Sequence, residues 1–284
     1  LDADGAPELI VAVEFGPIRV LKNDRGRFRD QTRELGLSDI RSRWNGLAVG
    51  DFDGDGRPDL VATSWGRNTP WGASAQRPQL LFAGRFGGSD LGLLFARADS
   101  ASGKEMPLES FARLGVGFPV LRSRIATYTE FSTTAVEDLF VDGLAGATRV
   151  GATTFDHMLF LNRGDHLEAR ALPASAQLAP AFGVSVADFN GDGREDLFLA
   201  QNFFPTEISL PRFDNGAGLV LLGDGKGGVS ALSVQQSGIA MRGDQRGAAV
   251  ADFDGDGRVD LAVGQNGGPT RLWRNVSGRP GLRV

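Results

Sequence analysis

The chain has 284 residues, of which 41% are hydrophobic and 23% are charged, a composition typical of a globular protein that can bury a sizeable core. The formal net charge of −5 disfavours nucleic acid as the main partner, because phosphate binding needs a basic surface. The lack of cysteine excludes a disulfide framework, and no apolar run approaches the roughly 20 residues that span a bilayer.

An acidic repeat dominates the chain from its first residue. Residues 1–14 (LDADGAPELIVAVE) align with the second halves of three longer segments that share an Asp-rich stretch between apolar residues: 46–65, 183–202 and 247–266. The residue that matches Asp51 would precede Leu1, so we expect the chain to begin inside a repeat and to be a fragment of a longer protein. Repetition of one such unit indicates an array whose members pack against one another.

Each repeat is predicted to contribute two β-hairpins. Short β-rich runs flank the acidic stretch, and a second hairpin follows at 18–28, 158–172 and 219–232. Two successive hairpins make four antiparallel strands, which is one blade of a β-propeller. The predicted fold is therefore all-β: a β-propeller of four-stranded antiparallel blades over residues 1–284, incomplete in this fragment, with about four or five blades.

Three stretches depart from this pattern. Residues 83–95 (AGRFGGSDLGLLF) are interpreted as a decayed copy of the acidic loop that binds no metal, because it retains only Asp90, at the wrong position. The apolar spacing of residues 105–139 is closer to helical, which predicts an insertion of two or three short helices. This insertion either covers an irregular blade or binds a partner. Residues 270–284 start another outer hairpin or lead out of the propeller.

The acidic loops have the ligand spacing of a calcium site. Counting Asp51 as position 1, side-chain oxygens at positions 1, 3, 5 and 9 and the carbonyl of Arg57 at position 7 can surround one cation. Ca²⁺ accepts about six to eight oxygen ligands in a flexible geometry, Mg²⁺ requires a tighter octahedron, and zinc would favour Cys or His. The predicted ligands are Asp51, Asp53, Asp55, Arg57 and Asp59; Asp188, Asn190, Asp192, Arg194 and Asp196; Asp252, Asp254, Asp256, Arg258 and Asp260; and, in the incomplete first copy, Asp2, Asp4 and Glu8.

A metal-free acidic turn is the alternative to this prediction. Three or four carboxylates within about 5 Å repel one another strongly unless a cation lies among them, so the repetition of the pattern favours metal. An EF-hand would need Glu at position 12, where Ala62, Leu199 and Val263 stand instead. A dockerin-type loop would need a helix after position 9, where small or β-branched residues follow. We expect three full calcium sites and a weak partial site in the first copy.

The segments DFDGDGRPDL, DFNGDGREDL and DFDGDGRVDL resemble FG-GAP/VCBS repeats, a family whose propellers include the head of the integrin α-subunit. The resemblance covers nearly the whole chain and implies an extracytoplasmic, Ca²⁺-binding role in adhesion or as a scaffold. The stretches FLNRGDHLEARALPASAQLAP and QNFFPTEISLPRFDNGAGLVLLGDGKGG resemble bacterial secreted proteins related to cartilage acidic protein, in which RNVSGRPGLRV would lead into an ASPIC/UnbV domain.

Sequence signals for catalysis are weak. Gly223, Gly225 and Gly228 match the dinucleotide-binding pattern G-x-G-x-x-G, but the related segment 23–28 reads as a hairpin turn, which argues against a nucleotide site. No G-x-S-x-G motif occurs, and two histidines leave little scope for a Ser-His-Asp triad. Glycoside chemistry with paired carboxylates stays an alternative, because acidic residues are abundant.

One predicted surface combines aromatic and amide side chains. The end of the strand that follows each acidic loop, and the approach to the strand before it, should lie on the propeller face opposite the loops. Aromatic side chains mixed with amides and an arginine are suited to binding a glycan or a protein, although ordinary loop packing gives the same pattern. The residues of this predicted ligand face are Trp44, Trp65, Asn202, Phe203, Arg246 and Asn266.

These features favour an extracellular Ca²⁺-binding β-propeller, secreted, periplasmic or at the cell surface, that acts as a protein- or carbohydrate-binding adhesion scaffold. The first alternative is a propeller-based polysaccharide lyase or hydrolase that uses acids on the metal-free face. The second alternative is a structural spacer within a larger surface protein. A pair of acids or lysines deep in the central channel would favour the enzyme, an exposed aromatic platform the binder, and a featureless face the spacer.

Overall fold

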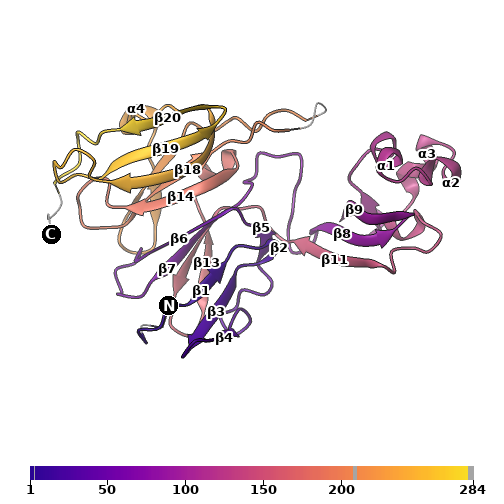
Figure 1. Ribbon diagram of the computed structural model, residues 1–284, viewed down its shortest axis with the longest axis horizontal. Helices are drawn as coiled ribbons and strands as arrows, with labels where there is room; N and C mark the ends of the chain where they lie inside the picture. The colour runs from indigo at the N-terminus through magenta and orange to yellow at the C-terminus, as the bar shows by residue number, and fades with distance from the viewer. Residues whose placement is uncertain (3, 207–209, 281–284) are drawn as a thin grey trace. The chain divides into compact units, whose positions relative to one another are not determined.

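Figure 1 shows the computed structural model of the chain, which describes residues 1–2, 4–206 and 210–280. The chain divides into two compact units. The first, called the repeat unit, comprises Leu1–Ser38, Arg43–Pro70 and Phe155–Val284. The second, called the inserted unit, comprises Asp39–Ser42 and Trp71–Thr154. Each unit contains a separate cluster of buried apolar side chains, which is the usual mark of a domain.

The repeat unit is built from antiparallel sheets of three or four strands, which confirms the predicted all-β class. Two sheets have four strands and two have three. In strand order, they are β1 (Leu9–Val11), β3 (Arg19–Asp24) and β4 (Arg27–Asp30); β13 (Leu167–Ala171), β12 (Met158–Asn162), β7 (Asp59–Thr63) and β6 (Gly46–Gly50); β14 (Ala181–Ala187), β15 (Asp196–Gln201), β16 (Leu219–Gly223) and β17 (Val229–Ala231); and β18 (Asp244–Ala251), β19 (Asp260–Asn266) and β20 (Gly268–Trp273).

Small residues let the first strands of neighbouring sheets approach closely. Strand β14 lies between β6 and β18, and the Ser185 hydroxyl donates a hydrogen bond to the Ala248 carbonyl at 3.2 Å. A Cβ atom at Gly46 would lie 2.8 Å from the carbonyl oxygen of Phe182, so a larger residue would push the two sheets apart. The three strands form a row, and the described sheets of the repeat unit do not close into a ring.

Strands β7 and β15, which follow the acidic loops in the two four-stranded sheets of the repeat unit, lie at the centre of its core. Every residue of β7 and of β15 is buried, as expected for a strand that is covered on both faces. Apolar side chains from both sheets fill the space between them, including Phe52, Leu159, Leu197 and Leu221. This packing holds the start of β7 and of β15 in a fixed place, and both strands begin at the last residue of an acidic loop.

The larger segment of the inserted unit, Trp71–Thr154, lies in the sequence between β7 and β12, which belong to one sheet. It has a four-stranded sheet of β10 (Glu105–Pro107), β9 (Ser89–Ala98), β8 (Gln79–Phe86) and β11 (Ala147–Ala152). Three short helices and a 3₁₀ turn follow β10: α1 (Phe111–Gly117), α2 (Leu121–Arg124), α3 (Tyr128–Thr133) and η1 (Val136–Asp138). Their apolar side chains pack on the sheet, so the predicted helical insertion at 105–139 is confirmed as part of a larger unit.

The interpretation of residues 83–95 as a decayed acidic loop is wrong. This segment is the hairpin of β8 and β9, which are joined by a tight turn at Gly87 and Gly88. Both glycines have positive φ angles, 60° and 77°, which a two-residue hairpin turn requires and which glycine adopts without strain. The Gly-Gly pair is therefore the turn of one long hairpin, and the segment does not have the conformation of the acidic loops.

The remaining elements are short. They are β2 (Glu14–Pro17), β5 (Arg41–Arg43), η2 (Ala176–Leu178) and α4 (Val234–Ser237). Of the segment 270–284, residues up to Trp273 belong to β20, the last strand of its sheet, and residues 281–284 lie outside the described residues. Across the described part of the chain, no helix combines the length and apolar character that a membrane crossing needs.

Candidate metal centres

The three full acidic loops share one backbone conformation. They connect β6 to β7, β14 to β15 and β18 to β19. In the first loop, Gly54 and Gly56 have positive φ angles of 74° and 83°, and the other two loops repeat these values within two degrees. Residues with a side chain rarely adopt this conformation, which explains why glycine recurs at positions 4 and 6.

The carboxylate at position 1 organises each loop from inside. Asp51 accepts hydrogen bonds from the backbone N–H groups of Gly54 at 2.8 Å, Asp55 at 3.2 Å and Gly56 at 2.9 Å. Asp188 and Asp252 accept the same three bonds in their own loops. The loop is thus curled around its first carboxylate by bonds that the protein itself supplies.

The carboxylate at position 9 joins the two hairpins of a blade. Asp59 is buried and accepts hydrogen bonds from the backbone N–H groups of Phe52 at 2.8 Å and of Asn162 at 2.7 Å. Asn162 ends β12 in the second hairpin, so this bond crosses from the inner to the outer half of the sheet. Asp196 and Asp260 make the matching pairs of bonds. Sequence reasoning assigned position 9 to metal alone and missed this structural role.

Burial makes the negative charge at position 9 costly without a cation. It raises the pKa of Asp59, and the charges of Asp53 and Asp55 add to the increase. Burial likewise raises the pKa of Asp196 to about 6. A cation bound in the loop would offset this cost, because it attracts the ionised form.

Carboxylate oxygens converge in two of the full loops. Asp51, Asp53 and Asp59 each offer an oxygen within 4.8 Å of the others, and Asp252, Asp254 and Asp260 do the same. Two oxygens bound to one Ca²⁺ at about 2.3–2.6 Å lie no more than about 5 Å apart, so this spacing fits a calcium ion. Asp53 Oδ1 is buried without a hydrogen-bond partner, and such an atom needs a ligand.

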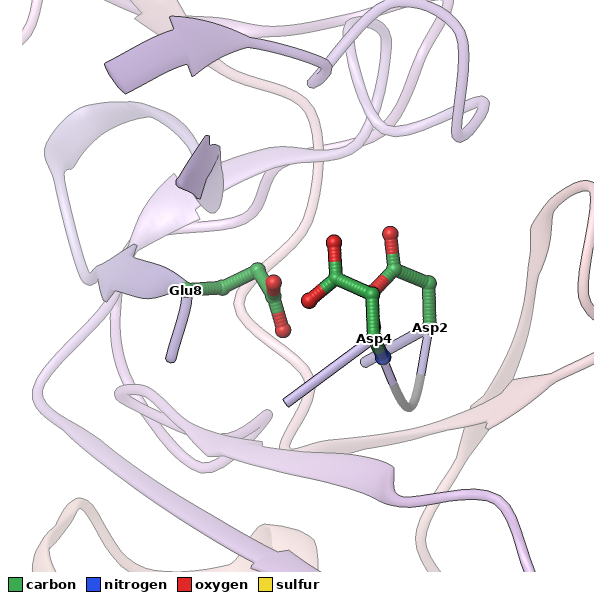
Figure 2. Close-up of side chains that lie close together, drawn as sticks. All are labelled: Asp2, Asp4 and Glu8. Atoms are coloured by element: carbon green, nitrogen blue, oxygen red, sulfur yellow. Dashed lines mark hydrogen bonds between the residues drawn. The ribbon is translucent and has the colours of Figure 1, made fainter. Parts of the chain in front are cut away.

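The incomplete first copy forms a third cluster of the same kind. Figure 2 shows the carboxylates of Asp2 and Asp4 side by side and facing Glu8, and these three residues also bring oxygens within 4.8 Å. Glu8 Oε1 is buried without a hydrogen-bond partner, while its second oxygen pairs with the amino group of Leu1. Lys22 on β3 pairs with both Asp2 and Asp4. The protein's own cations thus balance part of the charge of this cluster.

The loop at 188–196 differs in its third position. Asn190 stands there, so three carboxylates do not converge in this loop among the described residues. Its amide oxygen accepts the backbone N–H of Asp192 at 2.8 Å. An amide oxygen is also a calcium ligand, so the donor set stays suitable with one negative charge fewer.

The arginines at position 7 were predicted to contribute only their carbonyl oxygens. Their side chains also turn back to the carboxylate at position 5 of the same loop. Arg57 pairs with Asp55, and Arg258 pairs with Asp256 at 2.7 Å, whereas Arg194 and Asp192 are 3.7 Å apart. Position 5 is therefore partly neutralised inside each full loop.

Comparison with known families agrees with the repeated loops. Residues 1–62 match the FG-GAP-like repeat, and residues 246–278 match the FG-GAP repeat. Two segments of the chain are thus similar to FG-GAP repeats. The first FG-GAP match contains the Asp2 cluster and the loop 51–59, and the second contains the loop 252–260. FG-GAP repeats occur in extracellular adhesion-type β-propeller proteins. No curated protein matches the chain.

The predicted ligand face is not an exposed platform. Trp44, Trp65 and Asn202 are buried, with exposed fractions of 5%, 6% and 0%, so these three side chains are not on the surface, where a ligand could reach them. The physical reason is packing between sheets: Trp65 makes edge contacts with Phe182, Phe203 and Phe213, with the ring centres 5.0–6.0 Å apart. Trp65 and Phe213 are buried, and the half-buried Phe182 and Phe203 cover Trp65.

Two more residues of the predicted face stabilise the same region. Arg246 stacks over the Phe182 and Phe203 rings, at 4.4 and 5.2 Å, and donates to Asp244 and to the Asn202 carbonyl. Asn266 is exposed and donates to Asp244 at 3.2 Å. The structure therefore brings most of the predicted residues together, and it uses them to join β15, β18 and β19.

Replacing Asn202 by glycine is expected to lower the free energy of unfolding by about 2 kcal/mol, because buried groups would lose their partners. Its side chain donates to the carbonyls of Gly216 and Gly243 and accepts the N–H of Gly216. Glycine keeps the positive φ of 88°, so the variant isolates these bonds. Asn266→Gly at the matching exposed position is the control. Equal chemical denaturation curves for the two variants would contradict the structural role.

Proposed function

We propose that the repeat unit is a calcium-binding β-propeller scaffold that works outside the cytoplasm and presents a surface to a protein or carbohydrate partner. The observation that carries the calcium part is the convergence of carboxylates in the loop 51–59, where Asp53 Oδ1 is buried without a partner. An oxygen in that position is explained by a cation that the loop is built to hold.

Calcium suits this donor set better than other divalent ions. The proposed ligands are all oxygen atoms, from carboxylates, one amide and the backbone carbonyls at position 7, and zinc would favour nitrogen or sulfur. Magnesium requires near-ideal octahedral geometry and keeps several waters, whereas Ca²⁺ accepts a larger and less regular set of oxygen ligands, such as each loop offers. Each bound ion would join the ends of the two innermost strands of a blade.

The extracytoplasmic part of the proposal rests on affinity and on the family. Extracellular calcium modules bind with Kd values of about 10⁻⁴–10⁻³ M, so such sites fill outside the cell and stay empty in the cytosol. The partner-binding role rests on the occurrence of FG-GAP repeats in adhesion-type proteins. A relationship to bacterial secreted proteins related to cartilage acidic protein is proposed on the sequence resemblance alone.

Calcium bound per chain is the direct test. After dialysis against about 1 mM calcium, we expect elemental analysis to find up to three ions in the full loops, with a weaker fourth at Asp2, Asp4 and Glu8. Asp55→Ala should remove one ion, and Asp165→Ala, at an exposed acid outside the loops, should remove none. A chain that retains no calcium, or that loses the same amount in both variants, would contradict the proposal.

A further inference from the structure

A basic side chain from the second hairpin reaches the position-3 carboxylate in three of the four acidic loops. Arg163 Nη1 lies 2.5 Å from Asp53 Oδ2, Arg274 pairs with Asp254, and Lys22 pairs with Asp2. Strand register explains two of these contacts. Leu9 pairs with Leu21, and Leu261 pairs with Trp273, so Lys22 and Arg274 occupy the same place in their sheets. Phe160 pairs with Leu60, so Arg163 stands two residues beyond the place of Lys22 and Arg274. From the β12–β13 turn it still reaches the position-3 carboxylate of its own loop, Asp53.

The remaining loop, 188–196, lacks both partners of this ion pair. Position 3 is Asn190, and Leu222 occupies the place of Lys22 and Arg274, since Leu197 pairs with Leu221. At the place of Arg163 stands Asp224, whose Oδ1 accepts the N–H groups of Lys226 and Gly228 instead. Among the ion pairs of the described residues, none connects the loop 188–196 to its second hairpin. The carboxylate and the base are thus present together or missing together.

Within the three full loops, this joint variation keeps constant the formal charge of the ligand carboxylates and the bases bonded to them; Glu195, at position 8 of the loop 188–196, is not a proposed ligand and is left out of this count. The loop 51–59 has four ligand carboxylates and two bonded arginines, Arg57 and Arg163, which leaves −2. The loop 252–260 has four carboxylates against Arg258 and Arg274, again −2. The loop 188–196 has three ligand carboxylates and Arg194, which also leaves −2. One divalent cation would neutralise each of these three sets of ligands and bonded bases.

We propose that Arg163, Arg274 and Lys22 are built-in counter-charges that hold the position-3 carboxylate in the calcium-free loop and lower the calcium affinity of that loop. This inference rests on the proposed calcium function and names what tunes it. Asp53 is 9% exposed and uses Oδ2 for Arg163, which leaves Oδ1 for the ion. Arg163 also pairs with Glu168 at 2.8 Å, which holds its side chain beside the loop. It is therefore a positioning residue that shares one carboxylate with the bound cation, and two positive charges at one carboxylate repel each other.

Removing the base alone should separate its two effects. In Arg163→Gln, the loop 51–59 has a formal charge of −3, so the calcium-free protein should unfold at a lower temperature. Calcium should bind this loop about tenfold more tightly, which corresponds to about 1.4 kcal/mol, because the competing positive charge is gone. A purely structural arginine would lower stability without tightening calcium binding.

Removing both partners should reverse both effects. Asp53→Asn with Arg163→Gln copies the ligand set of the loop 188–196 and restores a formal charge of −2. We expect the double variant to regain most of the calcium-free midpoint and a calcium affinity within about threefold of wild type, so the two substitutions are not additive. Asp53→Asn alone should weaken calcium binding, because the loop then keeps the base without its partner carboxylate.

Hydrogen exchange followed by mass spectrometry resolves the loops one by one. Protection of the peptide that contains residues 51–59 is measured against free calcium, with the loop 252–260 of the same protein as an internal reference. Arg149→Gln, which removes an exposed ion pair with Glu105 in the inserted unit, is the control for loss of an arginine. Tighter binding in Arg163→Gln that is reversed in the double variant supports the inference.

Two other outcomes have distinct meanings. Calcium binding by wild type with an unchanged midpoint of binding in Arg163→Gln would overturn the counter-charge inference and leave the calcium function standing. A complete lack of calcium-dependent protection in every acidic loop would overturn the calcium function, and the counter-charge inference with it.

Discussion

Replacing about 10 mM calcium by EGTA is expected to lower the thermal midpoint of the repeat unit by on the order of 15 °C. An ion that binds only the folded state stabilises it by about 2.7 kcal/mol at roughly 100 times its Kd, so three filled loops contribute about 8 kcal/mol. Without the ion, the oxygens of Asp51, Asp53 and Asp59 repel one another within 4.8 Å. Calorimetry in the two buffers measures the change.

The loss of stability should be local to the blades. Hydrogen exchange is expected to quicken at the hairpins of β6–β7, β14–β15 and β18–β19, which the acidic loops connect. The inserted unit is an internal control, because its β8–β9 connection is the Gly87–Gly88 turn and holds no acidic loop. A uniform increase across both units, or an unchanged midpoint in EGTA, would contradict a role for calcium in the loops.

Two substitutions in one loop should respond differently to calcium. Asp55 pairs only within the loop in the calcium-free state, so Asp55→Ala should lower the midpoint in calcium and change it little in EGTA. Asp59 accepts the N–H groups of Phe52 and Asn162, so Asp59→Ala should lower the midpoint in both buffers. Equal responses of the two variants would show that position 9 has no structural role beyond the ion.

Acidification from pH 6.5 to about pH 4 is expected to cost the repeat unit about 3 kcal/mol through His157. Burial lowers the pKa of this histidine from 6.5 to about 4. Nδ1 accepts the N–H of Ser64 at 2.8 Å, and Nε2 lies 3.0 Å from the Ala179 carbonyl, so the folded state holds the neutral ring. The unfolded chain takes up a proton first as the pH falls, and stability is lost across this window.

Comparing variants isolates this contribution from those of the acids. The raised pKa of Asp196 acts in the opposite direction near pH 6, and acid also weakens calcium binding, so the measurement is made in EGTA. The difference in unfolding free energy between wild type and His157→Gln should shrink by about 3 kcal/mol from pH 7 to pH 4. His166→Gln, at the exposed second histidine, is the control. A constant difference would contradict the linkage.

The sequence by itself determined the calcium-loop prediction and the blade pattern. Loop ligands are local: positions 1 to 9 of the loop at Asp51 lie within one turn, and glycines at positions 4 and 6 allow that turn wherever it stands in the chain. Strand alternation and turn residues are equally local signals, which explains why the antiparallel sheets and the helices within 105–139 were predicted.

Only the tertiary structure decided which side chains meet across distant segments. Asp59 accepts the backbone N–H of Asn162, which is 103 residues later in the sequence, and Arg163 pairs with Asp53 over a similar sequence separation. A basic residue beside Asn in LKND, LNRG and WRNV was the available sequence signal for these contacts. Burial of Trp65 likewise depends on Phe182, Phe203 and Phe213 from the neighbouring sheet. Repeat alignment gives the face on which a residue lies, but exposure depends on how closely the next sheet packs against it.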